Sequence, residues 1–302
     1  MNEKIKKIIL SNISPPFHPV FILSAPRSGS SYFYEILRRM QNIWSFEKEN
    51  DPLWFQFFPY QRLEIPSDYI DESECTRKLI DSFKSQLLLK NIQTRRNTRK
   101  QDFLDHFLQR KPILYLEKTI ANCFHLDALE KIFPNALYIY MVRDGRACIS
   151  SMLEGWNSGF FWKRPLPFPK NSTVSHWTYP IPPGWQNVVR QTLPEICAWS
   201  WMEHNRYVLE RLQGNEMFHS RCMAISYEYL LAEPQHILEK VADFSNLTIT
   251  PECIQYIENK NTSWTTLSAP KADKWKEKNP EAIEQILPQI TPMLEQLESL
   301  VS

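Results

Sequence analysis

The sequence predicts an α/β protein with three layers, in which helices cover both faces of a central parallel sheet. Two stretches carry this prediction, residues 21–40 and 136–153, because each passes from an apolar strand through a polar turn into a helix. Composition agrees: 43% of the 302 residues are hydrophobic and 23% are charged, as in chains that bury a sizeable core. No stretch has the composition of a linker, so we expect one domain over residues 1–302.

The first stretch reads FILSAPRSGSSYFYEILRRM and contains a turn of small residues just before a helix begins. Unpaired N–H groups and the positive end of the helix dipole attract an anion to such a place. Arg27 adds a positive charge. A serine-capped connection without a ligand is the simpler alternative. The candidate binding residues of this turn are Arg27, Ser28, Gly29, Ser30 and Ser31.

The second stretch, ALYIYMVRDGRACISSML, repeats the order of strand, charged turn and helix. Arg143 closes the strand, and Ser151 follows eight positions later. Two turns of helix would carry the Ser151 hydroxyl to another part of the same anion. Two anion sites at strand ends indicate a ligand with two phosphates.

These two stretches resemble the sulfotransferases that use 3'-phosphoadenosine-5'-phosphosulfate (PAPS). APRSGSS is similar to their 5'-phosphosulfate loop, and VRDGRACISS to the segment whose Arg and Ser hold the 3'-phosphate. The motifs PRSG and MVRDGRA, with FPNA before the second strand, are more similar to the branch of tyrosylprotein sulfotransferases and many bacterial enzymes than to the cytosolic branch. The resemblance covers residues 18–50 and 112–155 and, more faintly, 194–245.

The resemblance implies a P-loop-like fold and PAPS as the cofactor, without a metal. The activity it implies is transfer of a sulfuryl group to a hydroxyl or amine of a small organic acceptor, such as a secondary metabolite. Tyr227, after the last predicted strand, would border the adenine, and Lys271 would replace a lysine of the family's late loop. Beyond that loop, the pattern of residues 280–300 predicts two amphipathic segments broken at Pro288 and Pro292.

A second buried strand, residues 112–116, ends in Glu117, Lys118 and Thr119. The cytosolic branch has Lys-Thr-His in mid-chain, whereas Ile120 follows the Lys-Thr pair here, so the histidine base of that branch is absent. Lys118 is expected to stabilise charge on the transferred group or its leaving oxygen. The alternative is a strand-end lysine in water.

The resemblance also implies a catalytic glutamate downstream of the loop arginine. Counting along the pattern leads to Lys48, with Glu47 and Glu49 on either side. We favour Glu47 as the base, and Glu49 and His176 are the alternatives. A solvated run of charges is the non-functional interpretation of this segment.

Residues 155–194 combine eight aromatic residues with seven prolines, so neither a regular helix nor a central strand is expected there. Long irregular segments of this kind are usually lids or binding loops, although a surface loop packed on itself is the alternative. Aromatic faces suit an organic acceptor with apolar bulk, or a cation. The candidate acceptor-binding residues are Trp156, Phe161, Trp162, His176 and Trp177.

Charge and cysteine usage exclude several classes of partner. The net charge of +1 gives no bulk attraction to nucleic acid or to an anionic membrane. The six cysteines show no CxxC pair and no zinc spacing with histidine, which favours a reduced cytoplasmic protein without a metal site. The start MNEKIKKIIL has too short an apolar run for a signal peptide, and no apolar run approaches the ~20 residues of a membrane span. Composition does not indicate an oligomeric state.

Two other functions fit the same strand-turn-helix pattern. A P-loop nucleotide kinase requires GxxxxGK followed by Ser or Thr, but Ser24 and Ser30 stand where the first glycine and the lysine belong. A nucleotide-binding module that has lost catalysis would bind the cofactor product without turnover. Either would keep the predicted fold.

Overall fold

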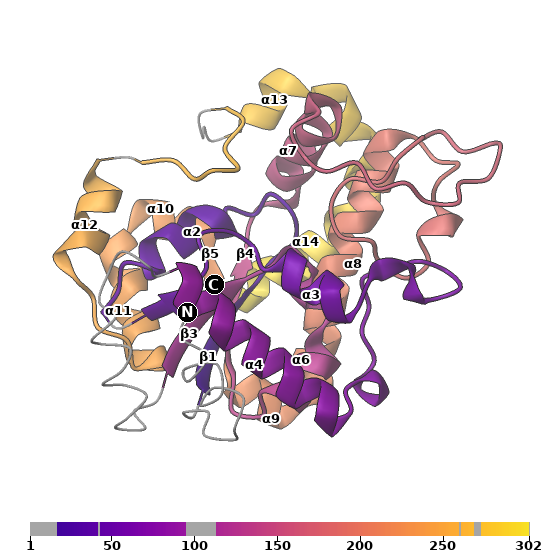
Figure 1. Cartoon of the computed structure of the whole chain (residues 1–302). Helices are drawn as coiled ribbons and strands as arrows, with labels where there is room; N and C mark the ends of the chain where they lie inside the picture. The colour runs from indigo at the N-terminus through magenta and orange to yellow at the C-terminus, as the bar shows by residue number, and fades with distance from the viewer. Residues whose placement is uncertain (1–16, 42, 95–112, 260, 269–272, 302) are drawn as a thin grey trace.

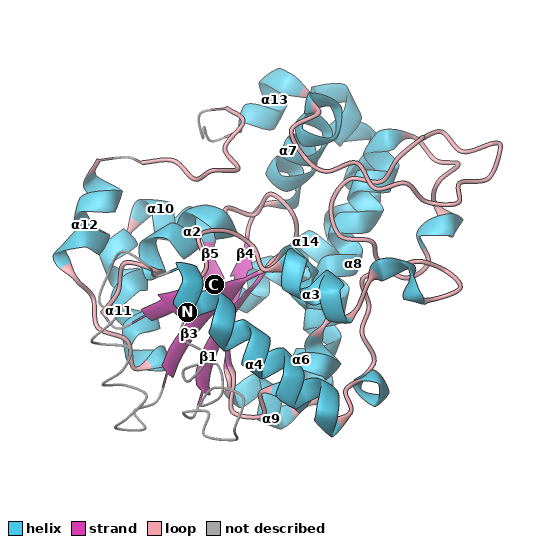
Figure 2. Ribbon diagram, viewed as in Figure 1, coloured by secondary structure: helices cyan, strands magenta, loops and turns pink. Residues whose placement is uncertain are grey.

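The computed structural model describes residues 17–301 except 42, 95–112, 260 and 269–272. Its central sheet has five strands in the order β2-β3-β1-β4-β5, and every neighbouring pair is parallel (Figure 2). The predicted parallel α/β architecture is therefore confirmed. The strands are β1 (Phe17–Leu23), β2 (Ile43–Ser45), β3 (Ile113–Lys118), β4 (Leu137–Val142) and β5 (Cys222–Ser226).

Strand β1 lies in the middle of the sheet and is buried on both faces, which explains its unbroken apolar sequence. Side chains alternate along a strand. Val20 and Ile22 therefore pack in one hydrophobic core, and Phe21 and Leu23 pack in the other. The sheet separates two cores, as a three-layer fold requires.

One core is covered by helices on the left of Figure 1, α11 and α12 among them. Helix α2 contributes Phe33, Ile36 and Leu37, whose spacing of three and four residues places them on one face. The helices of this layer are α2 (Ser30–Leu37), α10 (Tyr227–Ala232), α11 (Pro234–Ser245) and α12 (Pro251–Glu258).

The larger core lies under α4, α6, α7, α8 and α14 on the other side of the sheet (Figure 1). These helices are α4 (Arg77–Thr94), α6 (Leu126–Ile132), α7 (Gly145–Ser158), α8 (Leu193–Gly214) and α14 (Pro280–Val301). The short helices at the edges are α3 (Asp51–Phe57), α9 (Glu216–Ser220) and α13 (Lys274–Lys278).

The predicted break in the last helix is wrong, because α14 continues through Pro288 and Pro292. Ile283, Ile286 and Ile290 are buried in the larger core, and this packing holds the helix where proline removes backbone hydrogen bonds. Tertiary burial outweighs a local propensity that is unfavourable by ~3 kcal/mol per proline.

The segment between α7 and α8 is largely irregular, as its prolines predict, with one short 3-10 turn at Trp185–Asn187 and a single β-bridge between Arg164 and Trp177. Much of it is nevertheless part of the core. Trp177 and Trp185 are fully buried, and their indole N–H groups donate to the carbonyls of Pro180 and Pro66 at 3.1 and 2.9 Å. The segment is anchored to the domain rather than lying loosely over it.

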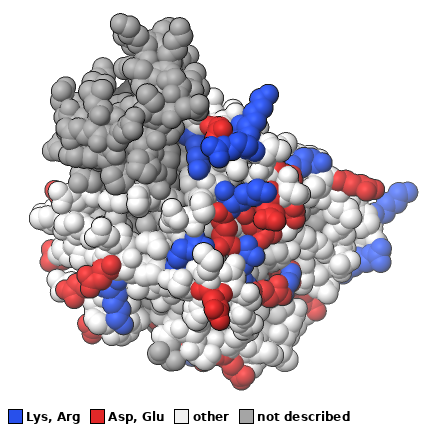
Figure 3. Space-filling model, turned by 90° about the horizontal axis from the view of Figure 1, so that it is seen from below, with Lys and Arg blue, Asp and Glu red and all other residues white. Residues whose placement is uncertain are grey.

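Acidic and basic side chains are interspersed on the face seen in Figure 3, in keeping with a net charge of +1. No helix within the described residues is both long and apolar enough to cross a bilayer.

Candidate functional site

A cavity of about 740 Å³ opens beyond the carboxyl ends of the parallel strands, where ligands bind in open α/β sheets. It brings together residues that follow β1, β3, β4 and β5 in the chain. The residues predicted from the sequence that line it are Arg27, Gly29, Ser30, Ser31, Lys118, Arg143, Ser151, Phe161, Trp162 and Tyr227.

The turn between β1 and α2 is held by its own hydroxyl groups. Ser24 Oγ donates to Ser30 Oγ at 2.9 Å, and Ser28 Oγ donates to the Ala25 carbonyl at 2.8 Å. Helix α2 has no side-chain cap at its N-terminus, so its first amide groups remain available to an anion.

Two residues of this turn have left-handed backbone conformations, Arg27 with φ 66° and Gly29 with φ 87°. The absence of a side chain at Gly29 also leaves room for the ring of Tyr227, because a Cβ at position 29 would lie 2.2 Å from Tyr227 Cε2. Only glycine satisfies both the φ angle and this close approach.

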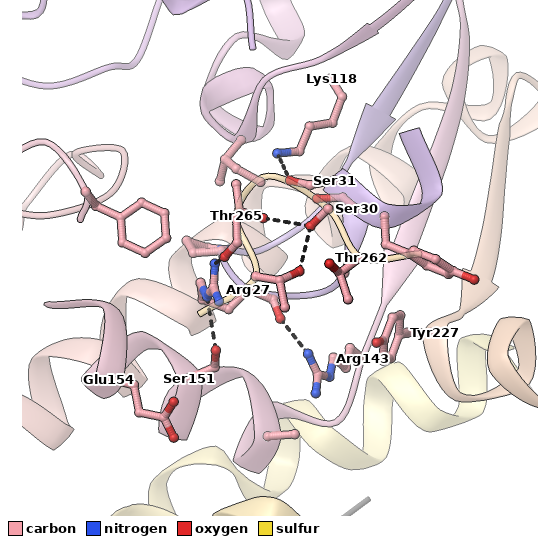
Figure 4. A pocket seen from close by; sticks show the side chains of 18 of the residues that line it. Arg27, Ser30, Ser31, Lys118, Arg143, Ser151, Glu154, Tyr227, Thr262 and Thr265 are labelled. Atoms are coloured by element: carbon pink, nitrogen blue, oxygen red, sulfur yellow. Dashed lines mark hydrogen bonds between the residues drawn. The ribbon is translucent and has the colours of Figure 1, made fainter. Parts of the chain in front are cut away.

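Two guanidinium groups lie close together in the cavity (Figure 4). Arg27 donates from Nε to Ser151 Oγ at 3.0 Å and from Nη1 to the Thr265 carbonyl at 2.8 Å. Arg143 donates to the Arg27 carbonyl at 2.9 Å and lies 4.5 Å from the ring centre of Tyr227. Within the part of the chain that the structure describes, neither arginine forms an ion pair.

Burial lowers the pKa of Arg27, and the charge of Arg143 contributes in the same direction. The Nε atom of Arg143 is buried and has no hydrogen-bond partner among the described residues. Two adjacent cations that form no ion pair with a described residue are unfavourable unless an anion neutralises them. The cavity is therefore suited to a ligand with phosphate groups.

Lys118 ends β3 and has a buried side chain. Its Nζ donates to Ser31 Oγ at 2.9 Å and forms an ion pair with Glu49 (Figure 4 shows Lys118 and Ser31). The ammonium group is thus placed between the anion-binding turn and a carboxylate. The ammonium of Lys118 can neutralise negative charge on a ligand, and the adjacent carboxylate of Glu49 can accept a proton.

The structure does not place Glu47, the residue favoured as the base, among those that line the cavity. Glu47 is exposed and lies outside the residues that line the cavity, and its carbonyl accepts from Arg38 Nη1 at 3.1 Å. Glu49 lines the cavity beside Lys118. The reason is a tertiary hydrogen bond: the backbone N–H of Asn50 donates to a β3 neighbour, Thr119 Oγ1, at 3.0 Å and holds the turn there.

One other predicted cofactor contact, Ser28, is not among the residues that line the cavity. Ser28 is buried, and its hydroxyl is used within the turn by the Ala25 carbonyl, so its side chain does not line the site. Lys271 lies outside the described residues.

Of the predicted acceptor-binding aromatics, Phe161 and Trp162 line the cavity, whereas Trp156 and Trp177 are buried in the core. His176 is not among the lining residues; it packs against Trp156 with ring centres 5.8 Å apart. Burial lowers the pKa of His176. Trp156, His176 and Trp177 therefore do not line the cavity, because composition cannot tell which aromatic rings of an irregular segment turn inward.

The structure adds lining residues that sequence reasoning missed, among them Ile120, Tyr179, Arg164 and Asp51. The pKa of Asp51 is raised well above its ordinary value, first by burial and next by the charge of Glu49. Asp51 starts α3 directly before a proline, which is a local signal of a helix N-terminus.

Arg164 is 4% exposed and forms a buried ion pair with Asp68. The ring centres of Phe55, Tyr60 and Trp162 lie 5.0–5.4 Å from its guanidinium carbon. Asp68 also accepts the backbone N–H of the irregular segment at residue 181, at 2.6 Å. Asp68 thus ties Arg164 and the backbone at residue 181 together beside the cavity, and no local sequence signal connects these residues.

Behind the cavity wall, Glu117 is buried and accepts hydrogen bonds from Thr119 Oγ1 and Asn122 Nδ2. Burial raises the pKa of Glu117 to about 7. The same Thr119 hydroxyl receives the N–H of Asn50, so Glu117 supports the turn that carries Glu49.

Residues 261–268 form the remaining wall, and Thr265 and Thr262 face the cavity (Figure 4). The Thr265 carbonyl is tied to Arg27, and on the other side Lys274 pairs with Glu154 of α7 at 3.2 Å. The wall is therefore joined to Arg27 through Thr265 and to Glu154 of α7 through the Ser268 hydroxyl.

A model of the sulfotransferase family matches residues 19–181 of the chain. A search of curated protein sequences gave no match. Among solved structures, the sulfotransferase domain from the curacin biosynthetic pathway is 20% identical over 91% of this chain and 99% of its own, with a TM-score of 0.49. The sulfotransferase domain of the Synechococcus PCC 7002 olefin synthase is 18% identical over 91% and 96%, with a TM-score of 0.46. A mouse sulfotransferase complexed with PAP is 13% identical over 98% and 95%, with a TM-score of 0.48.

Proposed function

Because the chain belongs to the sulfotransferase family, whose enzymes transfer sulfate, we propose that its donor is PAPS and its acceptor a hydroxyl or amine of a small organic molecule. The observation that carries the proposal is the pair of guanidinium groups, Arg27 and Arg143, which line one cavity without acidic partners among the described residues. A donor with separate phosphate groups matches two such cations.

The lining of the cavity fits the two ends of this donor. Arg27 and the N-terminus of α2 favour the 5'-phosphosulfate, and Arg143, with its free Nε, favours the 3'-phosphate. The hydroxyl of Ser151 also lines the cavity and already contacts Arg27. At the far end, aromatic and apolar side chains would border the adenine: Tyr227, Leu230, Pro234 and Ile257.

The reacting groups of the chain are Lys118, Arg27 and Glu49. The bound donor supplies the sulfuryl group, with PAP, 3',5'-adenosine diphosphate, as the second product. Glu49 takes the proton of the acceptor as the new S–O bond forms. Lys118 and Arg27 stabilise the electron pair that stays on the phosphate oxygen when the old S–O bond breaks. Atoms and charge balance without a metal ion.

The acceptor end favours a molecule with apolar or aromatic bulk. Phe161, Trp162, Tyr179 and Ile120 supply flat and aliphatic surface near Lys118. A small alcohol, phenol or amine, such as a secondary metabolite, fits this lining. Whether the sulfuryl group is transferred to an oxygen or a nitrogen atom of the acceptor is left open by the lining. A cytoplasmic location likewise stays a prediction from cysteine usage.

Calorimetric titration with PAP and, separately, with ATP tests the proposal. Binding of PAP in preference to ATP is expected, and Arg143→Ala should weaken it about tenfold or more, as the loss of a charge-assisted phosphate contact of ~1.5–3 kcal/mol implies. Arg77→Ala is the matched control, because the Arg77 side chain is 90% exposed and is not among the residues that line the cavity. Preference for ATP would favour the kinase alternative, and equal binding by the Arg143 variant would contradict the proposed site.

A further inference from the structure

Glu117 is a buried carboxyl group beside Lys118 that the proposed reaction does not use. Side chains alternate along β3, so Lys118 reaches the cavity and Glu117 does not line it. Among the described residues, Glu117 forms no ion pair, and its contacts are two hydrogen bonds. A carboxylate without a cation in such a place is unfavourable unless hydrogen bonds compensate for its burial.

Both carboxyl oxygens of Glu117 face hydrogen-bond donors. Thr119 Oγ1 donates to Oε1, and Asn122 Nδ2 donates to Oε2. Thr119 directly precedes the 3-10 turn Ile120–Phe124, and its side chain does not cap that turn. The amide oxygen of Asn122 lies 3.2 Å from His125 Nδ1, which leaves the amide N–H group for Glu117. An amide nitrogen can only donate, so Oε2 must accept.

The hydroxyl of Thr119 joins Glu117 to a second segment of the chain. The backbone N–H of Asn50 donates to Thr119 Oγ1 at 3.0 Å. A hydroxyl has one hydrogen, and directing it at Glu117 leaves a lone pair for the Asn50 N–H. Donation to a carboxylate also makes the hydroxyl oxygen a better acceptor. The charge on Glu117 therefore favours the contact that Thr119 makes with Asn50.

The N–H of Asn50 belongs to the peptide group that follows Glu49, so its hydrogen bond fixes the backbone next to that residue. The Asn50 carbonyl accepts two backbone N–H groups of α3, at 2.9 and 3.2 Å, which fixes the other side of the turn. The side chain of Glu49 then forms its ion pair with Lys118. The end of β3 thus holds Glu49 by its carboxylate, through Lys118, and by its backbone, through Thr119.

We propose that Glu117 is a positioning residue, whose carboxylate orients the Thr119 hydroxyl and thereby holds the backbone that carries Glu49. This inference rests on the proposed function of Glu49 as the base. A neutral side chain at position 117 would bring a hydrogen-bond donor to a place where both neighbours already donate. The Thr119 hydrogen would then lose its acceptor, and the contact with Asn50 would loosen. A general base acts only within hydrogen-bond reach of the proton that it takes, so a small displacement of Glu49 slows the reaction.

The titratable groups that face Glu117 among the described residues are Lys118, Glu49, Tyr34 and Tyr115. Burial raises the pKa of both tyrosines, so they stay neutral near pH 7. Burial and the charge of Glu49 raise the pKa of Glu117, its two hydrogen bonds and Lys118 lower it, and the result is about 7. The ionised form of Glu117 therefore becomes the major form between pH 6 and pH 8.

Hydrogen exchange tests the series of hydrogen bonds without any acceptor. The exchange rate of the Asn50 backbone N–H is measured at pH 8 by magnetic resonance, in protein labelled with nitrogen-15 asparagine and saturated with PAP. Glu117→Gln and Thr119→Val should each raise this rate about tenfold, and Thr119→Ser, which keeps the hydroxyl, should leave it near the native value. Glu130→Gln is the matched control, because it neutralises a carboxylate that is 16% exposed and outside the cavity lining. An unchanged Asn50 rate in Glu117→Gln would overturn the inference.

Kinetics test the positioning role through PAP release from PAPS, with 2-naphthol as the acceptor probe, so that transfer to water is counted as well. Glu117→Gln should lower kcat about tenfold with little change in the KM for PAPS, because the donor contacts are intact. Glu117→Gln combined with Thr119→Val should lose no more than the larger single effect, since both act through one series of hydrogen bonds.

The pH dependence separates the charge of Glu117 from a merely structural effect. The ratio of native to Glu117→Gln kcat should be larger at pH 8 than at pH 6, because the native carboxyl is partly protonated at the lower pH. Equal kcat values, or a ratio independent of pH, would refute the role. If PAP does not bind to the native protein, the proposed function itself fails; if PAP binds but Glu117→Gln changes neither the Asn50 rate nor kcat, only this inference fails.

Discussion

Replacing Gly29 by alanine tests how the anion-binding turn is built. Gly29 has φ 87°, and an added Cβ would lie 2.2 and 2.4 Å from two ring carbons of Tyr227. Gly159 offers a matched comparison, since it has φ 69° and open space around the same position. The two substitutions share the left-handed backbone and differ in the contact.

The structure supplies the magnitude of each effect. An L-residue in the left-handed region costs ~1–2 kcal/mol, which applies to Gly29→Ala and Gly159→Ala alike. The clash at Gly29 adds about 1–3 kcal/mol, typical of overpacking against a buried ring. The loss of unfolded-chain entropy is common to both variants and cancels in the comparison. We therefore expect Gly29→Ala to be less stable than Gly159→Ala by about 1–3 kcal/mol.

Urea unfolding of both variants measures this difference. Titration with PAP adds a functional readout: displacement of Tyr227 moves the ring on which Arg143 stacks, so binding should weaken about tenfold, a change of ~1.4 kcal/mol, in the Gly29 variant alone. In Gly29→Ala combined with Tyr227→Ala, the steric part of the destabilisation should disappear. Equal stability losses in the two glycine variants would refute the reasoning.

Two further predictions concern buried charges. Arg164→Ala leaves Asp68 buried without its cation and should lower the free energy of unfolding by about 3–5 kcal/mol. Arg77→Ala breaks an exposed ion pair and should lower it by less than about 1 kcal/mol. Similar losses for the two variants in urea unfolding would contradict the stabilising role of the buried pair. Burial raises the pKa of Glu117 from 4.5 to about 7, so the folded state retains a proton that the unfolded chain releases. The contribution of this proton to the free energy of unfolding is complete below pH 4.5, and it is lost as the pH rises through about 7. Glu117→Gln should therefore gain stability relative to the native protein between pH 5 and 8, and a difference independent of pH would rule the explanation out.

The parts of the site that were predictable from sequence are those made by consecutive residues. A strand, a turn and a helix N-terminus lie within residues 21–40, and the same order recurs in 136–153. Parallel strands bring their carboxyl ends to one edge, so Arg27 and Arg143 had to lie near each other once both strands belonged to one sheet. Local pattern and sheet geometry were sufficient there.

Contacts between segments that are distant in the sequence could not be predicted from the local sequence pattern. Arg164 and Asp68 are 96 positions apart, and neither has a local feature that points to the other. Phe161 and Trp177 belong to the same aromatic segment, yet one lines the cavity and the other is fully buried. In an irregular segment the side chains have no fixed period, so sequence cannot assign them to a face.

The end of β3 explains why the choice of base required the structure. Lys118 reaches the cavity, where it contacts Ser31 and Glu49, while its two neighbours use their side chains behind the cavity wall. Glu117 accepts from Thr119, and Thr119 receives the N–H of Asn50, the residue after Glu49. One strand end thus supplies the cation and also fixes the carboxylate that pairs with it. Because the hydrogen bond to Asn50 spans 69 positions, no count along the chain could distinguish Glu49 from Glu47, and the three-residue sequence at the end of β3 decides which glutamate enters the site.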